Sequence, residues 1–497
     1  MNNLKSEELE DKTEARNKIK ENVLYYFLLS FGFGLLFMVT FYDFDENFNG
    51  IFYLPFVIGL FAFTIAALKK MSIPIKKSSI ILIIAALLLG ISSVTTMNLF
   101  VIAFNTLGIQ ILYGLFLTKH FYQDRNWEIL QYLAHFLKLG IYSIGNMFLP
   151  FNHFVSRYKV KNQKLEQYKP VLRGFLFGIL FLSIIVPLLS SADLVFGTIV
   201  RDVTSYICNP FQGEWYVYVI FTIVGTLLFY GLLNTISKQQ EKTIEVIKEK
   251  REPISAITMT WLIAGIYILF CGIQIIYLFG GRVLELPEGI TYAEYAHQGF
   301  FQLLFVALIN IGMVLLLLDK VTNHKYLRMS LTVISFCTFI MITSAVYRMV
   351  LYVSVYHLSF LRILVLWFLA LLTIIMAGVV YYIYHKDFWI NRFLFFVTLI
   401  FYLFFAFIRP DYLVANYNIT HMEEISSSDM YYLTYLSLDA VPVLSEIREE
   451  QIDQDESKDI LRDYYNRIYN SNKKGIRNFN LSRYEAYQIV EKEMIKR

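Results

Sequence analysis

The sequence predicts an all-α protein: a polytopic bundle of about eleven transmembrane helices, with a cytoplasmic-side amphipathic helix and a small helical C-terminal tail. Of its 497 residues, 57% are hydrophobic and only 17% are charged, whereas about 25% of residues in a typical soluble domain are charged. The apolar residues are concentrated in long runs, and each run reaches the roughly 18–20 residues that cross a bilayer core. Runs of this length favour helices over strands, because a helix satisfies its own backbone hydrogen bonds in lipid.

The N-terminal segment, residues 1–22, is polar and mixed in charge, and the first apolar run begins near Val23. That run lacks a small-residue cleavage site, so we expect a retained first helix rather than a removed signal peptide. The first group of expected spans, within 23–117, comprises 23–42, 51–68, 78–96 and 99–117. The second group, within 171–409, comprises 171–190, 216–234, 256–279, 300–318, 329–350, 363–384 and 393–409.

The distribution of Lys and Arg predicts the orientation of these spans. Basic residues gather in the N-terminal segment and in alternate loops, near 69–77, 118–170, 235–255, 320–328 and 386–392. The intervening loops are nearly bare, and residues 43–50 and 96–98 contain no basic residue. Because basic loops remain on the cytoplasmic side, we expect a cytoplasmic N-terminus and an extracytoplasmic C-terminus in a bacterial plasma membrane.

Two polar regions flank the second group of spans. Residues 118–170 are too polar to cross the bilayer as a whole, but apolar residues recur there at helical spacing, at Trp127, Leu130, Ala134, Leu137, Ile141, Ile144 and Phe148. This pattern predicts an amphipathic helix on the cytoplasmic surface, and a helix packed under the bundle is the alternative. Residues 410–497 form a tail with an excess of acidic residues, which we expect to be extracytoplasmic and to offer a surface to another envelope protein.

Ionisable side chains beside the membrane are costly, so each one marks a candidate functional position. The expected orientation places seven of them on the outer side: Asp193, Glu294, His297, Arg348, Arg362, Arg409 and Asp411. The three acids and three arginines in this set can neutralise one another. The set therefore predicts either an outward-facing polar site for a charged ligand or headgroup, or a lattice of structural ion pairs that fixes helix ends.

Other polar residues suggest further functions. Asn105, Gln110, Gln274 and Asn310 lie deeper in their spans, where they could line a transport path or form hydrogen bonds between helices. Asp43, Asp45 and Glu46 could hold a divalent metal on a lipid phosphate, or could form a solvated turn. The sequence contains no P-loop, HExxH, GxGxxG or GxSxG motif, and its three cysteines and eight histidines lack ligand spacing. We therefore expect no cofactor, no bound metal and no nucleic-acid partner, with the lipid bilayer as the main environment.

Four stretches carry a family resemblance: SSAD at 190–193, YAEYAHQGFFQLL at 292–304, SAVYRMVLYVSVYHLSFLR at 344–362 and RPDYLVANYN at 409–418. They resemble the bacterial membrane family known as domain of unknown function forty-one seventy-three, and its relative forty-one fifty-three. The resemblance covers about residues 170–420. The chain departs from the family at His297 and Gln298, where the family usually has Arg. The resemblance implies no established activity and emphasises the same outer-side residues.

These observations predict a non-enzymatic membrane protein with an outward-facing polar site and a sensing or regulatory role at the envelope. A transporter is the first alternative, and it requires a path through the midplane lined by Asn105, Gln274 or Asn310. A lipid-linked group transferase is the second alternative, and it requires a metal or phosphate site that joins Asp43 and Asp45 to Arg348.

Overall fold

The fold is given by a computed structural model, which describes most of the chain. The described residues are 18–19, 21–42, 50–121, 129–150, 153, 178, 182, 185–186, 188–208, 215–238, 251–279, 300–452, 455–471 and 479–496. They divide between two compact units. Unit 1 comprises Met1–Leu87 and Gly108–Lys242, and unit 2 comprises Leu88–Leu107 and Thr243–Arg497.

Unit 1 contains helices α2 (Val23–Phe41), α4 (Tyr53–Lys70), α7 (Ile129–Gly145), α10 (Leu194–Cys208) and α11 (Trp215–Lys238). It also contains the first part of α5 (Ile80–Thr95), which follows the short 3-10 turn Lys77–Ser79, and the second part of α6 (Leu99–Phe121). The residues around the α5–α6 loop belong to unit 2.

Helices α2 and α11 pack closely because small residues face each other across their contact. A Cβ atom added to Gly225 would lie 3.0 Å from the Cα of Gly34, and one added to Gly34 would lie 2.5 Å from the backbone oxygen of Thr222. Backbones approach this closely in membranes where packing, rather than hydrophobic burial, drives helices together.

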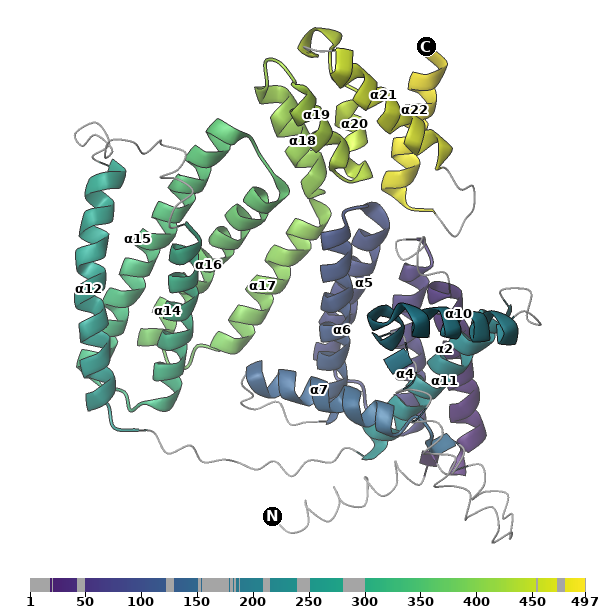
Figure 1. Cartoon of the computed structure of the whole chain (residues 1–497). Coiled ribbons are helices and arrows are strands. Elements are labelled where there is room, and N and C mark those ends of the chain that lie inside the picture. Colours follow the sequence, from purple (N-terminus) through teal and green to yellow (C-terminus); the bar gives the residue numbers. More distant parts are fainter. Residues whose placement is uncertain are drawn as a thin grey trace, which may run out of the picture. The chain divides into compact units, whose positions relative to one another are not determined.

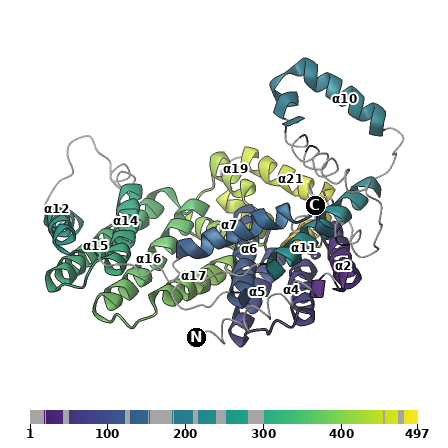
Figure 2. The same cartoon turned by 90° about the horizontal axis from the view of Figure 1, so that it is seen from below.

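The membrane part of unit 2 is a group of apolar helices around α15 (Figures 1 and 2). It comprises α12 (Ile254–Phe279), α14 (Phe300–Lys320), α15 (Lys325–Tyr356), α16 (Phe360–Tyr384) and α17 (Ile390–Phe407). Helix α15 packs against α12, α14 and α16, and apolar residues of these helices form one continuous core. Helix α17 packs against α16.

The tail continues from α17 as a set of shorter helices (Figure 1). These are α18 (Pro410–His421), α19 (Ser427–Tyr435), α20 (Val441–Leu444), α21 (Asp455–Asn470) and α22 (Leu481–Lys496), with 3-10 turns at Leu438–Ala440 and Glu449–Gln451. Pro410 occupies the first turn of α18, where its missing N–H costs nothing. Ser426 and Asp429 form a capping box at the start of α19. Apolar side chains from α18 to α22 share a core of their own.

The structure confirms the expected fold class. Among the described residues, ten helices are long and apolar enough to span a membrane, and they coincide with ten of the eleven expected spans. The remaining expected span, at 171–190, lies largely outside the described residues. Helix α15 is longer than the expected 329–350. It extends beyond that apolar stretch to include Lys325 and Arg328 at one end and Tyr352 and Tyr356 at the other.

Candidate functional site

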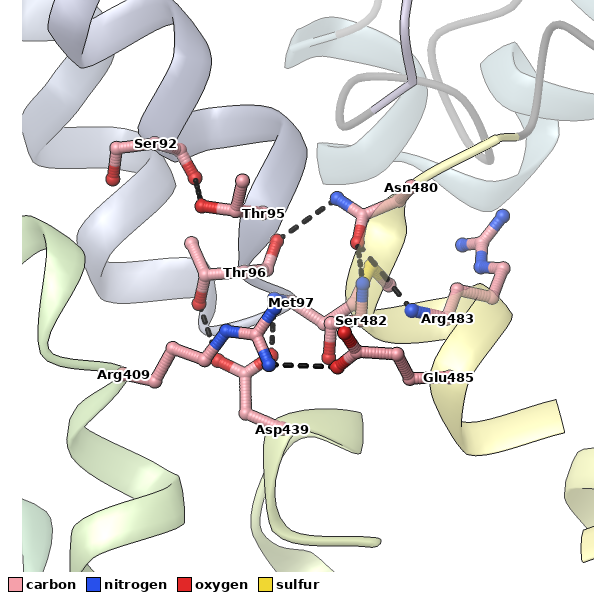
Figure 3. Close-up of polar contacts among 10 residues, drawn as sticks. All are labelled: Ser92, Thr95, Thr96, Met97, Arg409, Asp439, Asn480, Ser482, Arg483 and Glu485. Carbon is pink, nitrogen blue, oxygen red and sulfur yellow. Dashed lines mark hydrogen bonds and ion pairs between the residues drawn. The ribbon is translucent and has the colours of Figure 1, made fainter. Parts of the chain in front are cut away.

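The loop between α5 and α6 is held by an aspartate from the tail (Figure 3). Asp439 lies in the 3-10 turn Leu438–Ala440 and is fully buried. One of its carboxylate oxygens accepts a hydrogen bond from the Thr96 hydroxyl, and the other accepts one from the Met97 amide at 2.9 Å. The Thr96 hydroxyl oxygen also accepts a hydrogen bond from the Asn98 amide at 3.1 Å, so the loop and the aspartate form one network.

A second buried carboxylate, that of Asp411, binds the same loop. Its Oδ2 accepts hydrogen bonds from Asn98 Nδ2 at 2.9 Å and from the Ser437 amide at 3.1 Å. Asp411 lies in the first turn of α18, where the positive end of the helix dipole favours a carboxylate. Asn98 in turn uses its Oδ1 to accept from the Val101 amide at 3.0 Å, and this bond caps the start of α6.

The last helix supplies the third contact. Asn480 precedes α22 and donates from Nδ2 to the backbone oxygen of Thr96 at 3.0 Å (Figure 3). The same Nδ2 donates to the backbone oxygen of Ser93 at 3.3 Å. Its Oδ1 accepts from the Ser482 amide at 3.0 Å and so caps α22. We call Thr96, Asn98, Asp411, Asp439 and Asn480 the polar clamp, because together they fasten the α5–α6 loop to the tail helices.

An ion pair lies beside the polar clamp. Arg409 Nη1 lies 2.7 Å from Glu485 Oε2 of α22, and both side chains are partly exposed. Arg409 has a φ of 51° and precedes Pro410, and this left-handed residue separates the end of α17 from the start of α18. This break ends α17 and lets α18 begin, and Asp411 in the first turn of α18 binds the loop.

The α15–α16 turn is held in a similar way. His357 adopts a φ of 60°, and Arg362 donates to the backbone oxygens of Tyr356 and His357 that the turn leaves without helical partners. Asn418 of α18 accepts from the Leu358 amide at 2.8 Å and donates to the Leu358 oxygen at 2.9 Å. The tail therefore contacts two membrane loops, and Leu358 also packs against the tail core.

Burial sets the electrostatics of the polar clamp. It raises the pKa of Asp439 above the usual value for aspartate. The nearby Ser482 hydroxyl, the hydrogen bonds from Thr96 and the Met97 amide, and the charge of Arg409 oppose this rise. Protein donors bind both carboxylates of the clamp, so these contacts fix the α5–α6 loop to the tail.

The structure distributes the seven sequence-predicted residues among different environments. Arg362, Arg409 and Asp411 lie where the tail meets the two loops. Arg348 is buried about two turns before the end of α15, with Nη2 at 3.4 Å from Gln274 Oε1. Asp193 is exposed in unit 1 and caps α10, accepting from the Phe196 amide at 2.8 Å. Glu294 and His297 lie outside the described residues.

The deeper polar residues mostly bind neighbouring helices. Asn105 donates to Ser92 and Ser93 and accepts from Tyr402 at 2.8 Å. Asn310 accepts from Tyr267 at 2.8 Å and donates to Thr338 at 2.9 Å, and Gln274 accepts from Ser344 at 2.6 Å. Gln110 is exposed. These bonds match the interhelical alternative for Asn105, Gln274 and Asn310. Asp43, Asp45 and Glu46 lie outside the described residues.

Sequence reasoning missed Asp439, Asn98 and Asn480. Two signals could have indicated the first two. Asp439 is the one acid within an otherwise apolar run, LSLDAVPVL, and Asn98 ends a three-residue loop between two long spans. Asn480 has no comparable signal, because its role depends on a fold that brings it beside Thr96.

A comparison with protein families provides the context for these contacts. The family model for a domain of unknown function, DUF4153, matches residues 83–447, well over half of the chain. The chain belongs to this family. It is the family named above as forty-one fifty-three, so the resemblance is confirmed. The match includes Thr96, Asn98, Asp411 and Asp439 and ends before Asn480. Comparisons with curated proteins and with solved structures find no match.

Proposed function

We propose that this chain is a non-enzymatic, multi-pass protein of a bacterial plasma membrane whose tail senses or regulates an event at the outer face. The observation that carries the proposal is the polar clamp. The tail, which has an apolar core of its own, is fastened to two membrane loops by buried, directional hydrogen bonds. Buried polar networks of this kind specify one arrangement of the segments that they join. A change in the tail would therefore be transmitted to α5, α6, α15 and α16.

The contact between the tail and the α5–α6 loop supports the proposed orientation, because it constrains the number of membrane spans between them. Segments that touch outside the lipid lie on one side of the membrane, so the chain crosses an even number of times between Asn98 and Pro410. Seven described candidate spans lie between these residues. The expected span at 171–190 brings the number to eight. Three spans precede Asn98, so a cytoplasmic N-terminus places both the loop and the tail outside.

The exposed face of the tail supports a role in binding a partner. Tyr435 is 89% exposed and Tyr431 is 61% exposed, both on α19. Tyrosine is enriched among the residues that dominate protein interfaces. We propose that this face binds another envelope protein.

The orientation is tested by labelling single cysteines on intact cells with a membrane-impermeant thiol reagent, after the native Cys208, Cys271 and Cys337 have been replaced. Ser471→Cys lies at an exposed position after α21, and Asn323→Cys lies at an exposed position between α14 and α15. We expect Ser471→Cys to react on intact cells and Asn323→Cys to react only after lysis. The reverse pattern would place the tail in the cytoplasm and remove the envelope role.

The role of the clamp is tested in a strain that lacks the gene. We expect Asp439→Ala, at normal membrane abundance, to leave the strain as sensitive to osmotic and detergent stress as the deletion. Asp463→Ala removes an exposed tail carboxylate outside the clamp and should restore the wild-type phenotype. Full restoration by Asp439→Ala would contradict transmission through the clamp.

A further inference from the structure

Unit 2 contains a cavity of about 820 Å³ on the surface of α12 and α15, and none of its lining residues belongs to the polar clamp. Most of its walls are apolar, including Ile268, Ile275, Val333 and Phe336. Tyr384 at the end of α16 also lines it. Phe336 is 67% exposed, so the cavity faces the surroundings of the helix bundle, which for a spanning helix are lipid.

One end of the cavity is basic. Lys325 and Arg328, on the first turns of α15, line it together with the hydroxyls of Thr332 and Tyr384, which lie 2.8 Å from each other. Arg328 is partly buried, and its Nε is shielded from solvent without a hydrogen-bond partner among the described residues. Within the same described part of the chain, neither Lys325 nor Arg328 forms an ion pair. A buried guanidinium nitrogen without an acceptor is costly, so this end of the cavity is suited to an anionic group.

We propose that the cavity is a binding site for an anionic phospholipid, with one acyl chain along the apolar walls and the phosphate at Lys325 and Arg328. The length of the cavity lining agrees with the thickness of one leaflet. The lining runs along α15 from Lys325 to Ile340, about 22 Å at the helical rise per residue. One leaflet of the hydrocarbon core is about 15 Å thick, so the site accommodates a chain and reaches the headgroup level.

The polar end also has the composition of a membrane interface. Tyrosine is enriched at the headgroup level, and Lys and Arg near a span attract anionic lipids. Arginine matches phosphate geometry through paired donors, whereas lysine acts as a point charge. Two cations that form no ion pair within the described part of the chain favour a net negative headgroup over a zwitterionic one, whose ammonium would meet like charge.

The test uses the full chain, purified in detergent and titrated with phosphatidylglycerol or phosphatidylcholine of identical acyl chains, with bound lipid measured by native mass spectrometry. We expect phosphatidylglycerol to bind more tightly. Each neutralised cation should weaken its binding about fivefold, so Lys325→Gln with Arg328→Gln should weaken it about 25-fold. Lys320→Gln removes an exposed cation at the end of α14 that does not line the cavity, and it should have no effect.

A second pair of variants tests the apolar part of the site. Gly272 lines the cavity, and a Cβ added there would meet no atom within 4 Å, so Gly272→Leu places a side chain at the cavity wall with room for its Cβ. Gly265 on the same helix has equally open surroundings and lies outside the cavity. We expect Gly272→Leu to weaken phosphatidylglycerol binding and Gly265→Leu to leave it unchanged. Equal binding of the two lipids to the wild type, or equal binding by all the variants, would overturn the proposal.

Discussion

The contribution of Asp439 can be calculated from its contacts. Asp439→Ala leaves the Met97 amide without its acceptor and removes one partner of the fully buried Thr96 hydroxyl. An unsatisfied buried donor costs about 1–3 kcal/mol. The Thr96 oxygen keeps its bond from the Asn98 amide, and the variant also removes a buried carboxylate, so we expect a net loss of about 2 kcal/mol at this contact.

The assay is amide hydrogen exchange of the segment around Met97, followed by mass spectrometry. A loss of about 2 kcal/mol increases exchange through local opening about 30-fold, because each 1.36 kcal/mol is a factor of ten. Asp439→Asn keeps an acceptor for the Met97 amide and can donate to the Thr96 oxygen, so its effect should stay below about 1 kcal/mol. Unchanged exchange in Asp439→Ala, relative to the exposed control Asp463→Ala, would refute the calculation.

Three further perturbations test other parts of the structure. Because burial raises the folded-state pKa of Asp439, the pH-dependent part of its contribution to stability is complete below the unfolded value near 3.8 and is lost as the pH rises through the folded value. In the wild type, protection of the α5–α6 loop from hydrogen exchange should therefore decrease with rising pH relative to Asp439→Asn. Hydrogen exchange corrected for the pH dependence of the intrinsic exchange rate measures this difference. A double-mutant cycle on Arg409 and Glu485 should give below about 1 kcal/mol in thermal unfolding, because both side chains are partly exposed; a larger coupling would contradict this. Gly34→Ala should destabilise unit 1 by about 1–3 kcal/mol through its clash with α11, whereas Gly140→Ala, which meets no atom within 4 Å, should not lower the unfolding temperature.

The spans could be predicted from the sequence because lipid imposes one requirement on every crossing segment. Each segment must be long, apolar and helical, and these properties are local. The ends were less predictable. Lys325 and Arg328 are charged, so hydropathy excluded them from the ninth expected span, yet they occupy the first turns of α15. A helix can extend beyond the bilayer wherever its polar end reaches water or headgroups.

The site was only partly predictable. The cost of charge beside lipid drew attention to Arg362, Arg409 and Asp411, and each of them has hydrogen-bond partners in the structure. It could not identify those partners, because Asp439 and Thr96 are separated by 343 positions in the sequence. The expectation of one cluster also grouped Arg348 with the others, although it lies deeper, beside Gln274. The cost of placing a charge beside lipid identifies residues that need a partner. Only the packing of the tail determines which partner each residue has.

The length of α15 explains why its turn to α16 needs the tail. At 32 residues the helix is about 48 Å long, whereas the hydrocarbon core is about 30 Å thick, so one or both ends lie outside the lipid. Its C-terminal carbonyls must then be satisfied by other groups, and Arg362 and Asn418 supply bonds at this turn. Asn418 is 1% exposed and its bond to the Leu358 amide is half-buried, so Asn418→Ala leaves that amide without its protein acceptor and should cost about 1 kcal/mol. Hydrogen exchange should rise at residues 356–360 and stay unchanged around Met97, because the α5–α6 loop has its own contacts. Equal increases at both loops would mean that the tail detaches as a whole, and the two attachments would then be one cooperative unit.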